Sequence, residues 1–312
     1  MLEDKEMRSV YCELLLEAAE KDPRICVLDA DLMRANGVLP FRDRFPERTI
    51  DAGIAEANMI GVASGLSTMG LIPFAGSFCT FSSRRCYDQI FVSAAYAGLN
   101  VKILGTDPGI TAELNGGTHM SFEDYGILRC IPEMTIVEPV DTTQLRALFP
   151  QILEHYGTVY IRLARKKAEK VFSDNASFTL GKAARLRAGT DAAIFSTGIM
   201  VSRALQAAEI LEAEGIRVRV ENMHTIKPID REAIVSAAND CGAIVTAENH
   251  NVVGGLASAV SEMAAQCRPV PMEFVGVQDQ FGQVGKMPFL GEYYHLLPED
   301  IAAAVRKAVS RK

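Results

Sequence analysis

The sequence predicts an α/β protein with two successive domains, each a mainly parallel sheet flanked by helices. Short apolar runs of strand length alternate along the chain with longer segments whose apolar residues have helical spacing. Such alternation is typical of a parallel sheet covered on both faces. A polar, Lys-rich passage over Ala164–Gly189 interrupts the pattern, which then starts again. The length of 312 residues also fits about two domains.

The first half of the chain supplies the elements of one domain. A helix is expected over Arg8–Glu20, and a second begins near Glu56. Asp141 is the expected N-cap of a third helix, over Thr142–Glu154, because its carboxylate can accept from a free backbone N–H. The expected strands are Ile25–Leu28, Val101–Gly105, Thr135–Val137 and Val159–Leu163.

The second half repeats the alternation on a smaller scale. We place the first domain at residues 1–170, a linker at 171–189 and the second domain at 190–312. The expected strands are Ala192–Ser196, Val218–Val220, Ile244–Ala247 and Phe274–Val277. The expected helices are Val201–Glu214, Gly255–Gln266 and Pro298–Ser310.

Composition excludes several classes of function. The net charge is -7, from 32 basic and 39 acidic residues without a long basic run, which argues against nucleic-acid binding. No apolar stretch reaches the length of a membrane span, and the N-terminus lacks the pattern of a signal peptide, so we expect a cytoplasmic protein. The seven Cys include no CxxC pair, so we expect reduced thiols and no metal site within this chain.

One carboxylate stands out at the start of an otherwise small and apolar helix. The run Asp51-Ala-Gly-Ile-Ala-Glu56 is typical of a strand end and a tight turn that lead into a helix. Taken alone, Glu56 would be a capping carboxylate that interacts with the helix dipole. Further segments downstream favour a functional role.

Two later segments carry chemistry-bearing side chains. Phe78 and Phe81 have helical spacing on an expected loop, directly before a polar, basic helix start that contains Arg84. Alone, the aromatic pair would be core residues. The segment Leu114-Asn-Gly-Gly-Thr-His119 presents a His after a Gly pair, and such a loop His is a good catalytic candidate.

These segments, in this order and spacing, resemble the pyrimidine-binding domain of the transketolase family of thiamine diphosphate enzymes. The resemblance continues through Arg129–Asp141, and the last third of the chain is similar to the transketolase C-terminal domain. Each motif alone would be weak, but together they cover essentially the whole chain.

The resemblance implies roles for five residues. Glu56 would bind a ring nitrogen of the cofactor's aminopyrimidine, whose imino form removes the thiazolium proton so that a ketol unit can be carried as an enamine. Phe78 and Phe81 would stack on the pyrimidine, with Arg84 as a further cofactor contact. His119 would face the reacting carbons of the sugar and donate to the developing oxyanion.

The substrate positions depart from the family pattern. Arg8 and Arg165 match positions that clamp a sugar phosphate, although surface or interdomain ion pairs are an equal alternative for them. Asp107 stands where the family often has a phosphate-binding His, and Ala35 replaces a phosphate-contacting Ser. A carboxylate beside a phosphate is repulsive.

Two further positions bear on the sugar. Asn115 stands where an Asp usually reads the ketose hydroxyl, and Asn can donate as well as accept. Arg34 is available to replace the lost anion contact. We therefore expect a ketose substrate other than the central pentose phosphates, with a different terminal group or hydroxyl pattern.

The family's diphosphate-binding segment, G-D-G-x(n)-N, is missing. The chain therefore resembles the C-terminal subunit of a split transketolase that is active only with a diphosphate-binding N-terminal subunit. That partner would hold Mg²⁺ or another divalent ion. The resemblance also implies self-association as a dimer within an α2β2 heterotetramer, through a large apolar interface.

Two alternatives remain at this point. The β subunit of a 2-oxo-acid dehydrogenase's decarboxylating component shares the fold and the Glu, but it usually has a His-His-Ser-type loop. The loop around His119 is more similar to transketolase or to a deoxyxylulose-phosphate-synthase-like enzyme. A non-catalytic scaffold subunit is the second alternative, and the joint presence of Glu56, Phe78, Phe81 and His119 argues against it.

Overall fold

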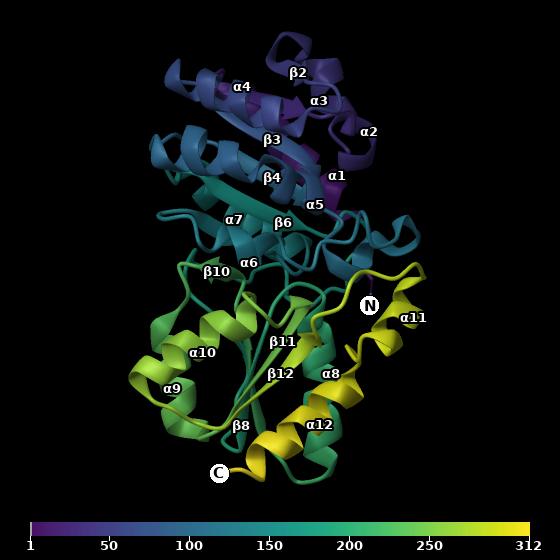
Figure 1. Cartoon of the computed structure of the whole chain (residues 1–312), viewed down its shortest axis with the longest axis vertical. Coiled ribbons are helices and arrows are strands. Elements are labelled where there is room, and N and C mark those ends of the chain that lie inside the picture. Colours follow the sequence, from purple (N-terminus) through teal and green to yellow (C-terminus); the bar gives the residue numbers. More distant parts are fainter. Residues whose placement is uncertain (1) are drawn as a thin grey trace. The chain divides into compact units, whose positions relative to one another are not determined.

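The computed structural model describes residues 2–312, which form two compact units (Figure 1). The first unit contains the chain up to Pro108 together with Ile127–Ser177, and the second contains Gly109–Gly126 and Phe178–Lys312. The second unit therefore includes a short excursion from the first half of the chain. Each unit has its own sheet.

The first unit is built on a parallel sheet. Its strand order is β5-β6-β4-β3-β1-β2, and every neighbouring pair is parallel. Most of these positions are buried, as expected for a sheet covered on both faces. The strands are β1 (Ile25–Asp29), β2 (Thr49–Asp51), β3 (Ile72–Phe78), β4 (Lys102–Thr106), β5 (Thr135–Val137) and β6 (Val159–Leu163).

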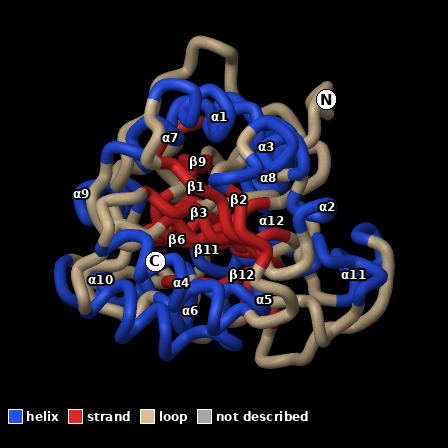
Figure 2. Tube along the Cα trace, turned by 90° about the horizontal axis from the view of Figure 1, so that it is seen from above, coloured by secondary structure: helices blue, strands red, loops and turns tan. Residues whose placement is uncertain are grey.

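Helices cover both faces of this sheet. Helix α1 (Met7–Lys21) packs on α7 (Thr142–Glu154), and α4 (Glu56–Thr68) packs on β3 and on η3 (Gln89–Tyr96). Figure 2 shows α1 and α7 on one side of the strands and α4 on the other. The remaining short elements are α2 (Met33–Asn36), α3 (Leu39–Arg44), η1 (Pro46–Arg48), α5 (Cys79–Ser82) and η2 (Arg84–Cys86). Within α6 (Asp124–Leu128) the chain passes from the second unit back to the first.

The second unit has its own five-stranded sheet, with the order β12-β11-β8-β9-β7. Among the strand pairs described for it, β7 with β9 is antiparallel and the others are parallel. The strands of this sheet are β7 (Ala184–Arg187), β8 (Ala192–Ser196), β9 (Val218–Asn222), β11 (Ile244–Asn251) and β12 (Met272–Val277), and the short strand β10 (Thr225–Lys227) is not part of it. Its helices are η4 (Gly109–Asn115), α8 (Met200–Ala213), α9 (Arg231–Cys241), α10 (Leu256–Cys267), α11 (Met287–Tyr293) and α12 (Pro298–Val309).

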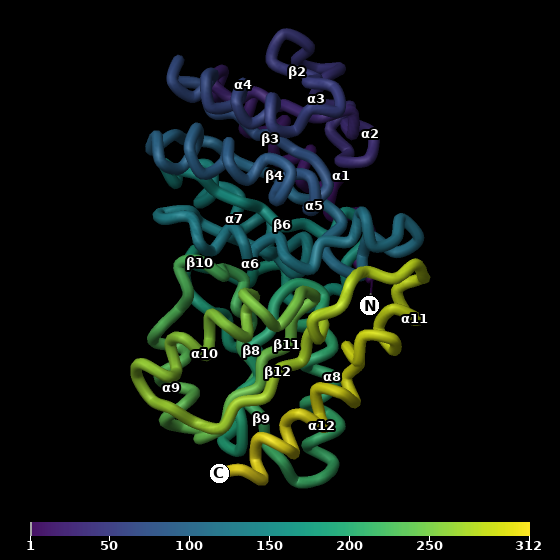
Figure 3. Tube along the Cα trace, in the orientation of Figure 1, coloured from purple at the N-terminus to yellow at the C-terminus, as the bar shows by residue number. Residues whose placement is uncertain are grey.

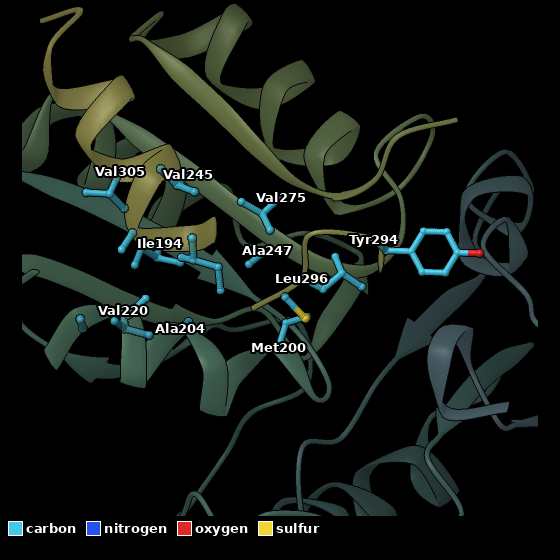
Figure 4. Packing of buried hydrophobic residues seen from close by; sticks show 14 of the residues in the cluster. Ile194, Met200, Ala204, Val220, Val245, Ala247, Val275, Tyr294, Leu296 and Val305 are labelled. Carbon is cyan, nitrogen blue, oxygen red and sulfur yellow. The ribbon is translucent and has the colours of Figure 1, made fainter. Parts of the chain in front are cut away.

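The core of the second unit lies between this sheet and a pair of helices far apart in the sequence. Helices α8 and α12 pack on each other, as the path of the chain in Figure 3 shows. Side chains such as Ile194, Val245 and Val305 fill the space between them and the strands (Figure 4). Residues Ile110 and Phe122 of the excursion join this cluster, which explains why the excursion belongs to the second unit.

The predicted architecture of mainly parallel sheets flanked by helices is confirmed. Asp141 caps α7 by accepting the Gln144 N–H at 2.9 Å. Two local expectations were wrong. Phe78 and Phe81 are not on a loop, because Phe78 ends β3 and Phe81 lies in α5. The segment before Phe78 forms a fully buried central strand, although Pro73 and Gly76 are typical of a loop. The expected linker at 171–189 contains the edge strand β7.

Within residues 2–312, the structure has no helix that is both long and apolar enough to cross a membrane.

Candidate active site

Glu56 is the first residue of α4, and its side chain is buried at 2% exposure. One carboxylate oxygen, Oε1, accepts from Arg85 Nη1 at 2.8 Å. The other, Oε2, is buried and has no hydrogen-bond partner among residues 2–312. A buried acceptor without a hydrogen-bond partner lowers the stability of the folded state by about 1–3 kcal/mol. The first turn of α4 therefore presents an acceptor suited to a donor from outside the chain.

An aromatic pair lies beside this carboxylate's partner. The Arg85 guanidinium carbon is 3.9 Å from the Phe81 ring centroid. The Phe81 and Phe78 centroids are 6.1 Å apart, with the ring planes tilted by 33°. Arg165 in turn lies 5.3 Å from the Phe78 centroid. Glu56, the two rings and Arg165 thus belong to one connected group in the first unit.

The sequence interpretation missed Arg85. Arg84, the expected cofactor contact, is the neighbouring residue of η2 and is also exposed. Arg85 makes the ion pair with Glu56, with its side chain 46% exposed. Two adjacent arginines carry the same signal in a sequence, and only the geometry of the short η2 turn decides which of them faces α4.

The three candidate anion-binding arginines are joined through the backbone. Arg8 N–H donates to the Arg165 carbonyl at 3.2 Å. Arg8 Nη1 donates to the carbonyl of Ala35 at 2.9 Å, and Arg8 Nε pairs with Glu6 at 2.7 Å. Arg34, next to Ala35, is exposed and makes no ion pair within the described residues 2–312. Arg8 therefore contacts the backbone of Arg165 and of Ala35, and Arg34 is the chain neighbour of Ala35.

Asp107 is the carboxylate that pairs with Arg165. It follows β4, is 1% exposed and adopts a left-handed φ of 56°. Its Oδ1 lies 2.8 Å from Arg165 Nε. This pair is the alternative that the sequence left open for Arg165, although an ion pair does not prevent the other guanidinium nitrogens from binding a ligand.

A buried polar network holds the loop that carries Arg34. Asp29, at the end of β1, accepts from Leu32 N–H and from Asn36 Nδ2, at 2.5 and 2.7 Å. Asn36 Oδ1 accepts from Thr106 Oγ1 at 2.8 Å. Burial raises the pKa of Asp29 to about 7, while these hydrogen bonds act in the opposite direction. No pattern in the sequence indicated this network.

Asn115 and His119 lie in the second unit. Asn115 ends η4 and is exposed. His119 follows in a turn, where its N–H donates to the Gly116 carbonyl at 3.0 Å, and its Nδ1 lies 2.9 Å from Thr118 Oγ1. The Gly pair thus presents the imidazole from a tight turn, as the sequence predicted.

A second segment of the same unit packs closely on this turn. A Cβ added to Gly117 would lie 2.3 Å from the Gly282 carbonyl oxygen, and one added to Gly282 would lie 2.6 Å from Gly117 Cα. Met287 N–H also donates to Glu113 Oε1 at 3.2 Å. The backbone around Gly282 therefore holds the turn that carries His119, a contact that the sequence interpretation missed.

The Glu and His of the run Glu248-Asn-His250 have structural partners. Glu248 accepts from Tyr125 Oη at 2.7 Å and from the first N–H groups of α10, Leu256 and Ala257, at 2.6 and 2.8 Å. His250 stacks on Tyr125 with the ring centroids 4.0 Å apart. These contacts hold the turn that connects β11 to α10.

Within the part of the chain that the structure describes, residues 2–312, no group of three or more His, Cys, Asp or Glu side chains is placed to hold a metal ion. What the first unit offers is a buried carboxylate, with one oxygen available to an outside donor, beside two aromatic rings. That combination fits a planar heteroaromatic group that hydrogen-bonds Glu56 through a ring nitrogen and lies against Phe78 or Phe81.

The fold and this site agree with the comparisons to known protein families. Residues 3–170 match the transketolase pyrimidine-binding domain, and residues 181–301 match the transketolase C-terminal domain. The chain belongs to the transketolase family.

Particular relatives narrow this class to subunits of split enzymes. The chain is 56% identical over 311 residues to the 6-deoxy-6-sulfo-D-fructose transketolase subunit SqwH of Clostridium sp., covering 100% of this chain and 97% of that protein. It is 34% identical to a subunit of the apulose-4-phosphate transketolase of Phocaeicola vulgatus, covering 97% of each. A solved structure described as a split gene transketolase, inactive beta4 tetramer, aligns with a TM-score of 0.91 at 44% identity, covering 98% of this chain and 99% of that one.

Proposed function

We propose that this chain is the pyrimidine-binding subunit of a two-chain, thiamine diphosphate-dependent transketolase. It takes a two-carbon ketol unit from an anionic ketose and passes it to an aldose. The observation that carries the proposal is Glu56, a buried carboxylate at the start of α4 with one oxygen that has no partner among residues 2–312. A non-catalytic scaffold would have no use for so costly a group.

The residues of the first unit hold the cofactor's pyrimidine. Glu56 would hydrogen-bond a ring nitrogen of the pyrimidine, and Arg85 holds its carboxylate through Oε1 at 2.8 Å. Phe78 and Phe81 supply apolar surface for the ring. When bound, thiamine diphosphate supplies the electron sink that ketol transfer requires.

The residues of the second unit act on the sugar. His119 donates a proton or hydrogen bond to the substrate oxygen that gains charge. Asn115 contacts a ketose hydroxyl, since its amide can donate and accept. We assign Arg8, Arg34, Asp107 and Arg165 to the end of the sugar that carries the anionic group.

The partner subunit holds the diphosphate and its divalent ion. The proposal is supported by a 44% identical split transketolase, which is described as an inactive β tetramer. We propose an α2β2 assembly, with this chain as the β subunit.

We propose a sulfonated ketose as donor, on the basis of the 56% identity to a 6-deoxy-6-sulfo-D-fructose transketolase subunit. Exposed Arg34, which makes no ion pair within residues 2–312, supports an anionic terminal group. Removal of the ketol unit from this donor leaves a four-carbon aldehyde that keeps the sulfonate, and the acceptor aldose gains two carbons.

The test has two stages. Calorimetry with thiamine diphosphate and Mg²⁺ should detect binding to the co-purified pair of subunits and little binding to this chain alone. The pair should then transfer a ketol unit from 6-deoxy-6-sulfofructose to an aldose phosphate. Tight cofactor binding to the lone chain would contradict the split site. Equally efficient turnover of xylulose 5-phosphate with ribose 5-phosphate would contradict the donor assignment.

A further inference from the structure

The guanidinium cluster of the first unit contains its own counter-charges. We define it as Arg8, Arg34 and Arg165 together with the carboxylates of Glu6 and Asp107. Arg8 Nε lies 2.7 Å from Glu6 Oε2, and Arg165 Nε lies 2.8 Å from Asp107 Oδ1. These two ion pairs are neutral overall, and Arg34, the chain neighbour of the Ala35 carbonyl that accepts from Arg8, adds one net positive charge.

The cluster is built into the fold. Arg8 N–H donates to the Arg165 carbonyl at 3.2 Å, and Arg8 Nη1 donates to the Ala35 carbonyl at 2.9 Å. The Arg8 stem also packs on Gly37, where an added Cβ would lie 3.1 Å from Arg8 Cγ. Gly37 has a φ of 78° and ends α2, the short helix that carries Arg34.

Its carboxylates distinguish terminal groups by their charge. A sulfonate carries one negative charge, whereas a phosphate monoester carries about −1.5 to −2 at neutral pH. A dianion would meet the Asp107 carboxylate, which is 1% exposed and so poorly screened by solvent. A terminal group with one negative charge neutralises the single net positive charge of the cluster, whereas a terminal group with two negative charges leaves one of them uncompensated.

We infer that Asp107 and Glu6 set the charge selectivity of the substrate site, so that the cluster accepts a ketose with a singly charged terminal group and disfavours a doubly charged one. This inference rests on the proposed function for the position of the sugar's anionic end. It assigns the two carboxylates a positioning and neutralising role toward Arg165 and Arg8, and no part in the bond-making steps.

The experiment compares three ketoses with the same carbon skeleton and a terminal hydroxyl, sulfonate or phosphate: fructose, 6-deoxy-6-sulfofructose and fructose 6-phosphate. Dissociation constants are measured by calorimetry on the reconstituted pair of subunits without an acceptor, and kcat/KM is measured with one. Wild type should bind the sulfonate most tightly. Asp107→Asn should raise the preference for phosphate relative to sulfonate by about 10- to 100-fold, and Glu6→Gln should change it in the same direction.

Asn suits the left-handed backbone at position 107, so Asp107→Asn should fold. The matched control is Glu13→Gln on α1, which removes a carboxylate that pairs with Lys5 and Arg146 outside the cluster. The control should leave the phosphate-to-sulfonate ratio unchanged. A general loss of structure would weaken the binding of all three sugars together without changing the phosphate-to-sulfonate ratio.

Three results would overturn the inference: a phosphate preference in wild type, an unchanged ratio in both cluster variants, or binding of none of the three sugars. If the sugars bind but no ketol unit is transferred, the proposed function fails, and the binding ratios still decide whether the charge rule holds.

Discussion

Replacing Glu56 with Gln should remove most of the activity without destabilising the chain. Glu56 is 2% exposed, yet only one of its oxygens has a partner within residues 2–312. That partner, Arg85, is itself 46% exposed, so its guanidinium would be hydrated after the substitution. The amide keeps an acceptor for Arg85 and removes a buried charge.

The magnitude follows from three opposing contributions. Removal of the buried charge relieves about 1–3 kcal/mol, although the amide still buries a polar group at the position of the unpartnered oxygen. The pair with half-exposed Arg85 returns about 0.2–1 kcal/mol, and the dipole of α4 about 0.3–1 kcal/mol. We therefore expect Glu56→Gln to leave the isolated chain as stable as wild type or to stabilise it by about 1 kcal/mol. Ketol transfer should fall by about 100- to 10,000-fold, because the amide cannot share a proton with the ring nitrogen.

Urea unfolding of the isolated chain measures the free energy of unfolding, and the rate of ketol transfer by the reconstituted pair measures the activity. Glu47→Gln is a suitable control, because Glu47 is 69% exposed and lies 3.6 Å from Arg48; neither quantity should change. Destabilisation by more than about 1 kcal/mol would refute the assignment of Glu56 as a costly functional group. Transfer above one tenth of wild type would refute its catalytic role.

Three further substitutions test other parts of the structure. Gly282→Ala should displace the turn that carries His119, since the added Cβ would lie 2.6 Å from Gly117 Cα. We expect faster hydrogen exchange over residues 113–120 and a lower kcat, with Gln283→Ala as the unchanged control. Glu248→Ala should destabilise by about 3–5 kcal/mol, because it strands two backbone N–H groups and a buried phenol; a loss under 1 kcal/mol in urea would contradict this. Burial lowers the pKa of His224 to about 4. Its contribution to stability is present above pH 6.5 and is lost as the pH falls toward 4, by up to about 3 kcal/mol. In His224→Gln this loss should disappear from the urea titrations, and an identical pH dependence in variant and wild type would refute the assignment.

Local signals in the sequence were reliable where one residue acts on its immediate neighbours. Asp141 was predicted as an N-cap, and its carboxylate accepts from Gln144 N–H three residues later. Glu56 was predicted in a first helical turn and is the first residue of α4. In both cases the relevant partner is the backbone of the same turn, so short-range chemistry is sufficient.

Local signals failed where neighbouring strands decide the conformation. The run Ile72–Phe78 contains a Pro and a Gly, which are typical of a loop, yet it forms a strand between β1 and β4 with all of its positions buried. Strand pairing on both sides and burial of the apolar side chains outweigh the weak local propensity. For the same reason, local signals did not indicate the edge strand β7, which lies in the expected linker.

The sequence by itself determined the class of the protein: alternating apolar runs and helical segments specify two α/β units, and Glu56, the aromatic pair and the Gly-Gly-His turn specify the family resemblance. Only the tertiary structure decided the partners of those residues. Arg85 rather than Arg84 reaches Glu56, Asp107 reaches Arg165, and Gly282 supports the turn at Gly117 from a segment more than a hundred residues away. The physical reason is that backbone and side-chain propensities act over a few residues, whereas ion pairs and close backbone contacts depend on the register of strands and turns that the packed core sets.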